Sequence, residues 1–106
     1  MIKRILTDSG FTEGKTFKET RFIKPPKETY AVYFDSYNGR GADSLNLIKE
    51  HDYSIELYSD TPDPEAEGRI EQSLNKLGLE YEKSERYWIQ SEQLYQRIYN
   101  FNFIEK

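Results

Sequence analysis

The sequence predicts an α+β fold: a mainly antiparallel four-stranded sheet in the order β-β-α-β-β, with one main amphipathic helix packed on one face. The first observation behind this prediction is the alternation of residues 51–60, which is typical of a half-buried strand and gives Tyr53, Ile55 and Leu57 one face. The second is that the apolar period then lengthens to about 3.6 residues. The resulting helical stripe consists of Ala66, Ile70, Leu74 and Leu77. The third is the aromatic content of 15%, which favours strands elsewhere in the chain. We expect the stripe to pack over the apolar face of the strand.

For the first 29 residues, the sequence predicts an N-terminal arm or a short helix in addition to the main helix and the sheet. Ile2, Ile5 and Leu6 fall on one side of a helix over residues 2–8. Residues 16–24 alternate imperfectly, which leaves open an edge strand or an ordered arm. Pro25 and Pro26 end this segment, because proline cannot donate to a strand ladder.

The core is predicted to begin with the strand Tyr30-Ala-Val-Tyr-Phe-Asp. Apolar side chains occupy both of its faces, which places it inside the sheet. A loop over residues 36–44 should follow, because Asn38-Gly39 is a strong turn signal. The strand that contains residues 51–60 should then run antiparallel to the first.

Helix signals bracket the apolar stripe. Asp63 is a suitable N-cap, and Pro64 suits the first helical position, where no N–H is needed. Gly78 is expected to end the helix. Within the helix, Gly68 costs about 1 kcal/mol relative to alanine, and its usual reason is close packing against a neighbour.

The last third of the chain allows two interpretations. Tyr81, Trp88 and Tyr95 recur every seven residues, which a helix could use. We favour two strands, over residues 79–90 and 94–104, because both runs are rich in β-branched and aromatic residues. The second strand would carry an aromatic row on one face: Tyr95, Tyr99, Phe101 and Phe103.

A protein of two layers leaves the second sheet face without a helix. We expect Tyr33, Tyr58 and the aromatic row to lie on this uncovered face. Because monomers rarely expose a large apolar patch, something should cover it. Either the N-terminal arm folds over it or another subunit does, and the sequence leaves both open.

Length and composition limit the classes of function. The chain of 106 residues fits a single domain, residues 1–106, with the arm in 1–29 and the α+β core in 30–106. Without cysteine there is no disulfide and no thiolate site, and no apolar run is long enough for a membrane span or a signal peptide, so we expect a cytoplasmic protein.

Charge makes nucleic acid an improbable partner. The net charge is −4, whereas non-specific nucleic-acid binding needs a basic surface. The charge is also unevenly distributed: residues 1–30 hold seven Lys/Arg against four Asp/Glu, and residues 31–106 hold eight against fifteen. This imbalance is compatible with solvated surface, or with a basic arm that meets the acidic face of a neighbouring copy.

No catalytic, metal-binding or cofactor-binding motif is present. His51 is the only histidine, and its neighbour Asp52 should point to the opposite face of the strand, so we interpret His51 as a hydrogen-bonded strand residue. The acidic residues at 60–67 do not have the spacing of a calcium loop and are better explained by helix capping. The glycines at 39 and 41 lack the pattern of a phosphate-binding loop. We therefore expect no enzyme activity.

Several runs together resemble a known family. They are Phe22-Ile-Lys-Pro-Pro-Lys-Glu-Thr-Tyr-Ala-Val-Tyr, the Gly41-Ala-Asp loop, His51-Asp-Tyr-Ser-Ile-Glu-Leu-Tyr, Arg69-Ile-Glu-Gln-Ser-Leu in the helix, and Glu92-Gln-Leu-Tyr-Gln-Arg-Ile-Tyr-Asn-Phe. From Phe22 to its C-terminus the chain resembles the small tail-terminator or head–tail joining (tail completion, minor structural) proteins of long-tailed bacteriophages and prophages. Its N-terminal segment is shorter than is usual in them.

This resemblance implies a non-enzymatic subunit, without cofactor, that forms a ring, typically a hexamer. Such a ring caps the tail tube and contacts the head connector, so the expected partners are copies of itself, the tail tube protein and the head–tail connector protein. The expected location is the bacterial host cytoplasm during assembly, and then the virion tail or the head–tail junction. A closed ring needs one patch that meets a different patch on the next copy.

We expect the loop at 37–43 and the N-terminal arm to carry these contacts, so that reversing the charge of Arg40 or deleting residues 38–43 would abolish assembly. The candidate interface residues are Tyr37, Asn38, Arg40, Asp43, Tyr58, Arg97, Tyr99 and Phe101. The alternative is a stand-alone protein-binding module, a regulator or inhibitor that adds a partner strand to an open sheet edge.

Overall fold

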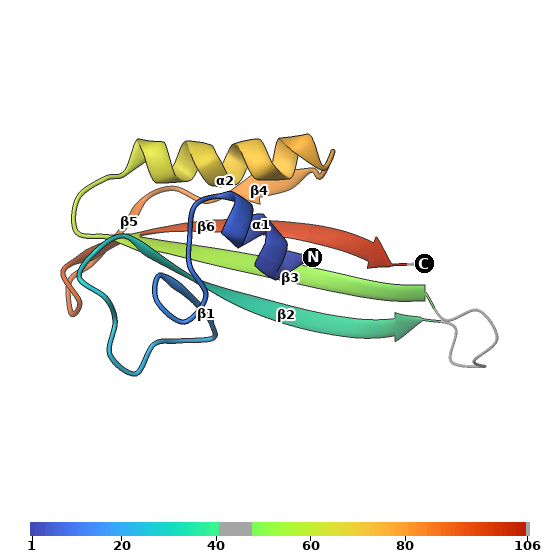
Figure 1. The fold of residues 1–106 in the computed structure, drawn as a ribbon, viewed down its shortest axis with the longest axis horizontal. Helices are drawn as coiled ribbons and strands as arrows, with labels where there is room; N and C mark the ends of the chain where they lie inside the picture. Colours follow the sequence, from blue (N-terminus) through green and yellow to red (C-terminus); the bar gives the residue numbers. More distant parts are fainter. Residues whose placement is uncertain (41–47, 106) are drawn as a thin grey trace.

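The computed structural model describes residues 1–40 and 48–105, and this part of the chain forms two helices and one mixed six-stranded sheet. The helices are α1 (Ile2–Asp8) and α2 (Pro64–Lys76). The strands are β1 (Phe17–Glu19), β2 (Tyr30–Arg40), β3 (Ile48–Ser59), β4 (Tyr81–Lys83), β5 (Tyr87–Ile89) and β6 (Leu94–Glu105). The strand order is β1-β2-β3-β6-β4, and β5 also pairs with β6 (Figure 1).

The fold is α+β as expected, but the sheet has six strands instead of the four of the expected β-β-α-β-β arrangement. The expected short helix is present as α1, and β1 forms an edge strand that runs parallel to β2. The other strand pairs are antiparallel. The single strand expected over residues 79–90 is divided into β4 and β5, which pair with different parts of β6.

The turn expected at Asn38-Gly39 is wrong, because both residues belong to β2. Pairing with β3 continues through Asn38↔Glu50 and Gly39↔Lys49 to Arg40↔Ile48. The local preference of Asn-Gly for a turn is therefore overridden by the ladder with β3. Asp43, which also belongs to the expected loop, lies outside the described residues.

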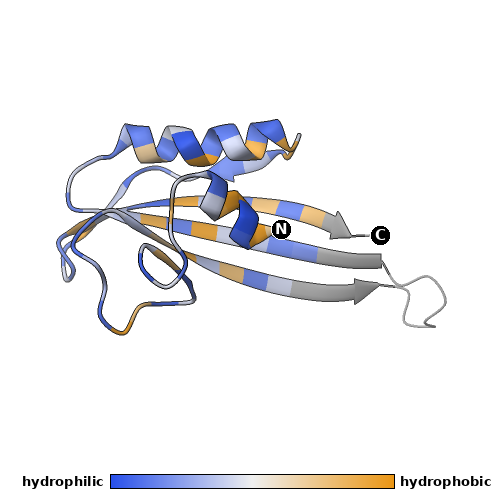
Figure 2. Ribbon diagram, viewed as in Figure 1, coloured by the Kyte–Doolittle hydropathy of each residue, from blue (hydrophilic) through white to orange (hydrophobic). Residues whose placement is uncertain are grey.

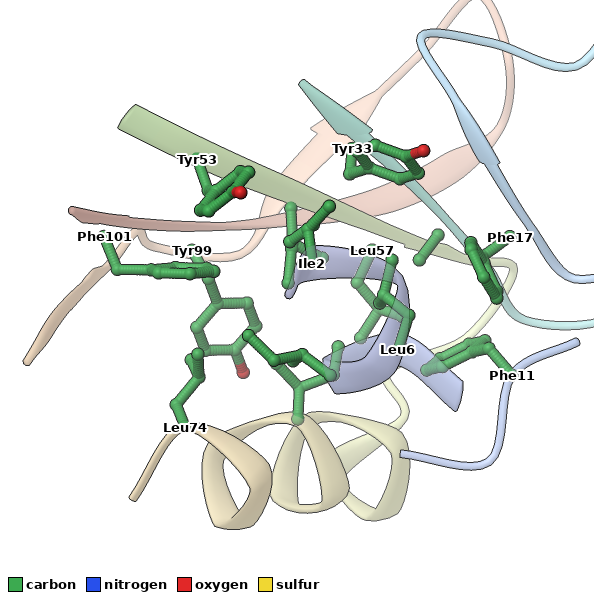
Figure 3. Packing of buried hydrophobic residues seen from close by; sticks show 14 of the residues in the cluster. Ile2, Leu6, Phe11, Phe17, Tyr33, Tyr53, Leu57, Leu74, Tyr99 and Phe101 are labelled. Carbon is green, nitrogen blue, oxygen red and sulfur yellow. The ribbon is translucent and has the colours of Figure 1, made fainter. Parts of the chain in front are cut away.

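Both helices lie on one side of the sheet, which we call the covered face (Figure 1). The apolar residues of α2 turn toward the sheet and its outer side is polar (Figure 2). Figure 3 shows Tyr53, Tyr99 and Phe101 of the sheet lying near Leu74 of α2 and Ile2 of α1. The buried apolar cluster consists of Ile2, Ile5, Leu6, Phe11, Phe17, Ala31, Tyr33, Tyr53, Ile55, Leu57, Ala66, Ile70, Leu74, Tyr99 and Phe101.

The expected helix stripe is largely confirmed. Ala66, Ile70 and Leu74 are fully buried, whereas Leu77 comes after the last helical residue and is 47% exposed. The carboxylate of Asp63 caps α2 by accepting a hydrogen bond from the N–H of Ala66, at 3.0 Å. A hydrogen bond from the Thr29 hydroxyl, at 2.7 Å, is the main reason that the pKa of Asp63 lies below its usual value.

The helix also contains a glycine that packing does not explain. A Cβ atom at Gly68 would meet no heavy atom within 4 Å, so the expected close neighbour is absent there. By contrast, Gly78 has a φ of +70° just after the helix, which is the conformation that favours glycine at this position.

A polar contact ties α1 to α2. The Ser9 hydroxyl lies 2.9 Å from the Ser73 hydroxyl, and the Nε of Arg69 donates to the carbonyl of Ser9 at 2.8 Å. Because α1 has only 7 residues, it would be marginal alone, so this contact and its buried apolar side chains hold it in place.

Three strands are long for a domain of this size: β2 has 11 residues, and β3 and β6 have 12 each. Their far ends run past both helices (Figure 1), and the molecule is elongated, with extents of 48 × 28 × 24 Å. The sheet therefore offers more surface than its own helices cover.

Candidate interaction surface

The sheet side that faces away from the helices, here called the open face, is assembled from alternate residues of the paired strands. The register places Val32 opposite Glu56, and Glu56 opposite Ile98. One row further along, Phe34, Ser54, Asn100 and Glu82 lie side by side across four strands. A row of Ser36, Asp52 and Asn102 follows.

A one-residue bulge between β4 and β5 adds apolar residues to this face. Lys83 pairs with Tyr99 and Tyr87 pairs with Gln96, so the three residues 84–86 lie opposite the two residues 97–98. Because successive side chains of a strand point to opposite faces, the extra residue exchanges the faces on which the odd and even residues of β5 lie. Tyr87 therefore lies on the open face beside Gln96, although the alternation of β4 would have put it on the covered face.

One end of the open face is partly covered by the chain itself. Residues 20–29, here called the β1–β2 loop, turn away from the helices (Figure 1). Within this loop, the ring of Phe22 lies edge-on to Tyr30, with centroids 5.4 Å apart, and Tyr30 stacks on Tyr58 at 5.2 Å. The loop and the β5–β6 turn border an apolar groove of about 210 Å³ whose floor includes Val32.

Tyr58 is fixed at the edge of this groove. Its hydroxyl donates to the Glu56 carboxylate at 2.6 Å and accepts from the side-chain amide of Gln96 at 2.8 Å. Burial, together with the hydrogen bond to Glu56, raises the pKa of the Tyr58 hydroxyl well above its usual value. The residue is half-buried, so it combines an accessible ring with a satisfied hydroxyl.

Beyond this groove, no described loop of the chain is seen to fold over the open face (Figure 1). A hollow of about 410 Å³ lies around Phe34, which is 37% exposed, and we call it the Phe34 hollow. Two exposed carboxylates, those of Asp52 and Glu82, belong to its lining. The remaining lining residues are Ser36, Tyr53, Ser54, Asn100, Phe101 and Asn102.

The covered face holds a network of charges instead. Glu67 of α2 is only 5% exposed, and its carboxylate accepts hydrogen bonds from Arg86 at 3.0 to 3.2 Å and from Arg97 at 3.2 Å. Arg97 also donates to the carbonyl of Ser84, in the bulge, at 2.7 Å. These bonds tie the bulge and β5 to the helix, which is a structural role.

Glu71, one turn further along α2, belongs to the same network. It accepts from the hydroxyl of Tyr99 at 2.7 Å and pairs with Lys83 at 2.7 Å. Burial acts to raise the pKa of Glu71, but the hydrogen bonds from Lys83 and Tyr99 outweigh it, so the pKa lies below its usual value. Burial also raises the pKa of the Tyr99 hydroxyl, which therefore stays protonated.

His51 forms a pair with a residue of the neighbouring strand. Its Nδ1 lies 2.9 Å from the Asp35 carboxylate, and its ring stacks on Tyr53 with centroids 5.2 Å apart. Asp52 points to the other face, as expected, and accepts from Asn102 at 2.8 Å.

The aromatic row of β6 is on the opposite face from the one expected. Pairing of Tyr53 with Phe101 and of Ile55 with Tyr99 puts the row on the covered face, where Tyr99 is 0% exposed. Tyr33 is also buried there. The expectation that this row lies uncovered is therefore wrong.

The candidate interface residues consequently separate into three groups. Tyr58 lies on the open face. Arg97 is hydrogen-bonded to Glu67, and two further candidates, Tyr99 and Phe101, belong to the core. The last three thus have structural roles within the chain. The remaining candidates are outside the described side chains: Tyr37, Asn38 and Arg40, which contribute backbone to β2, and Asp43, which is outside the described residues altogether.

Sequence reasoning missed Phe34, Glu82 and Ile23 as surface residues of interest. The alternation of β2 does put Phe34 on the face of Tyr30, but the facing of that strand could not be fixed without its neighbours. Glu82 joins the same row only through the pairing of β4 with β6. For Ile23 the local sequence did offer a signal: it lies between Phe22 and Lys24, just before two prolines, which is typical of a loop and indicates an exposed position.

The described residues contain no group of three or more His, Cys, Asp or Glu side chains that could hold a metal ion. No helix in the same part of the chain is long and apolar enough to cross a membrane. The chain matches no model of a known protein family and no curated protein.

Proposed function

We propose that this protein is a non-enzymatic structural subunit that assembles with copies of itself into a ring at the end of a bacteriophage or prophage tail tube. In this role it is a tail terminator or head–tail joining protein, and its partners are the tail tube protein and the head–tail connector protein. The tail assignment rests on the sequence resemblance from Phe22 onward.

One structural observation supports the assembly part of the proposal. The strands β2, β3 and β6 continue past both helices and present an open face that the described chain covers only at one end (Figure 1). A subunit needs a stable core and, beyond it, surface that a neighbour can bury. The helix-covered half supplies the first and the extended half supplies the second.

The test is the assembly state of the purified protein. Sedimentation velocity over a wide concentration range, followed by negative-stain microscopy, should show closed rings, with a hexamer as the expected number. A strict monomer at every concentration would contradict the proposal.

A shortened hairpin should separate assembly from folding. Gly39 pairs with Lys49 and Arg40 with Ile48, so deleting these four residues removes two complete pairs and keeps the remaining ladder in register. The thermal unfolding midpoint should change little, because this region lies beyond both helices, whereas ring formation should be lost. The charge reversal Arg40→Glu is a milder version of the same test.

The second candidate is a stand-alone module that binds a partner strand, and the edge of β2 favours it. The N–H of Ala31 and the carbonyl of Tyr33 bond to β1-side residues, so the odd-numbered residues of β2 direct their backbone groups to the outer edge. The pairing with β1 ends at Tyr33, and no described strand continues it along the rest of β2. Such an edge can accept a strand from another protein. A protein that remains monomeric and binds an extended peptide would favour this candidate.

A further inference from the structure

We propose that the β1–β2 loop of one copy docks into the Phe34 hollow on the open face of a second copy. This inference rests on the self-assembly in the proposed function, and it names the two surfaces that meet. Three observations support it: an exposed apolar side chain on the loop, a hollow with an exposed aromatic residue on the sheet, and opposite charge on the two surfaces.

The loop presents Ile23 in a fixed position. Ile23 is 81% exposed, which is the highest exposure among the large apolar side chains described. Its neighbour Phe22 is anchored on Tyr30, so the loop is attached to the sheet while Ile23 remains free of it. Pro25 and Pro26 restrict the backbone beside it, which lowers the conformational entropy lost on docking.

The hollow offers a complementary site. Phe34 is 37% exposed, so an apolar side chain could reach its ring there. Tyr53 and Phe101 also belong to the lining, but their rings are buried on the covered face, so Phe34 supplies the aromatic surface of the hollow. The volume of about 410 Å³ is sufficient for a branched aliphatic side chain and part of its neighbours.

Charge favours the same pairing. Residues 20–29 contain three cations, Arg21, Lys24 and Lys27, against one glutamate. None of the three cations takes part in an ion pair within the described structure. The described side chains that β2, β3, β4 and β6 place on the open face include three carboxylates, Asp52, Glu56 and Glu82, and β1 adds one cation, Lys18, beside Val32. Asp52 and Glu82 are the two of these charged residues that line the Phe34 hollow.

The two surfaces are different patches of one chain. The loop contacts its own sheet at Tyr30, two rows away from the row of Phe34 that opens into the hollow. When each copy gives its loop to the next copy and receives a loop from another, the contact is heterologous and forms a ring if the rotation closes. Two copies that exchange loops reciprocally would instead form a two-fold dimer, and the mass of the wild-type assembly distinguishes the two arrangements.

The first experiment compares three single substitutions by sedimentation velocity. Ile23→Asp and Phe34→Asp should each weaken association at least tenfold, because each buries a carboxylate in an apolar contact. Leu77→Asp is the matched control, since Leu77 is 47% exposed but lies on the helix side, and its assembly should equal that of the wild type. Circular dichroism melts confirm folding, and Phe34→Ser replaces Phe34→Asp if the latter unfolds.

Mixing then tests whether the loop of one copy binds the hollow of another. The Phe34→Asp copy keeps an intact loop and the Ile23→Asp copy keeps an intact hollow. An equimolar mixture should therefore form a 1:1 heterodimer that grows no further, although each variant alone is monomeric. A mixture that contains only monomers would overturn the proposed docking.

A charge exchange tests the electrostatic part. Lys24→Glu and Glu82→Lys should each weaken assembly, and the double variant should recover at least part of it. Wild-type rings that Ile23→Asp and Phe34→Asp leave intact would overturn this inference but not the proposed function. A wild type that never assembles would overturn both.

Discussion

The two faces of the sheet carry the same kinds of residue but use them differently. Tyr33 and Phe34 are adjacent in β2, yet Tyr33 is 5% exposed on the covered face and Phe34 is 37% exposed on the open face. On the covered face, aromatic rings and a charge network hold two helices and a bulged strand together. On the open face, aromatic rings lie at the margin of a groove and of a hollow. One strand therefore contributes Tyr33 to the core and leaves its neighbour Phe34 exposed on the other face.

The largest contrast should come from truncating these two neighbours. Tyr33→Ala removes a buried ring that packs against Phe17, with centroids 6.2 Å apart, and should lower the free energy of unfolding by about 3–5 kcal/mol. Phe34→Ala should lower it by less than about 1.5 kcal/mol, because the ring is already partly in water. Urea unfolding of both variants measures the difference, and equal losses would contradict this division of the two faces.

The charge network should give the next largest effect. Glu67→Ala leaves Arg86 and Arg97 without their buried carboxylate and should destabilise the protein by about 3 kcal/mol. Glu65→Ala is the control on the same helix, because the Glu65–Arg69 pair, at 2.9 Å, has an exposed carboxylate and is worth about 0–1 kcal/mol. A small effect of Glu67→Ala would mean that the network does not hold β5 to α2.

Much of this fold follows from periodicity, and the error about the aromatic row of β6 has one physical cause. Alternation predicted which residues of β2 and β3 share a face, and the 3.6-residue period predicted the buried stripe of α2. Alternation within one strand cannot decide which face is covered when both faces are apolar, as with Tyr99 and Ile98 in β6. That choice is made by the register with β3 and by the bond from Tyr99 to Glu71.

The surface was harder to predict than the core. The bulge at 84–86 reverses the facing of β5, and nothing in the local sequence marks it. The Phe34 hollow combines residues from β2, β3, β4 and β6, so it exists only once the sheet is paired. The basic loop was visible as a charge imbalance, whereas the exposure of Ile23 required the packing of Phe22 on Tyr30.

Two tyrosine hydroxyls allow a finer comparison of the faces. Tyr99→Phe removes a 2.7 Å hydrogen bond from a fully buried tyrosine to the part-buried Glu71 carboxylate, and should cost about 1.5–3 kcal/mol. Tyr58→Phe removes the 2.6 Å bond to Glu56 on the open face, where water can replace it, and should cost about 1 kcal/mol or less. Thermal and urea unfolding of the two variants test the order, and a larger loss for Tyr58→Phe would reverse it.

A substitution on the outer side of α2 should raise stability instead of lowering it. Gly68→Ala places a methyl group where no heavy atom lies within 4 Å, so it adds helix propensity without a clash. The expected gain in the free energy of unfolding is about 1 kcal/mol, with assembly unchanged. A loss of stability would show that Gly68 is needed for a contact outside the described chain.

The smallest effect concerns pH and arises from Glu71 on the covered face. Its pKa in the folded protein lies below the ordinary value of 4.5, so the folded state binds this proton less readily than the unfolded state. The resulting stability is fully present above about pH 5, and it is lost as the pH falls through 4.5 and then through the lower folded pKa. Glu71→Gln removes this contribution, so the variant should be less stable than the wild type at pH 7, and the gap should narrow as the pH falls below 4.5. Urea unfolding at pH 7 and at several pH values below 4.5 measures the difference in the free energy of unfolding between the two proteins. A difference that does not change with pH would mean that protonation of Glu71 does not affect stability.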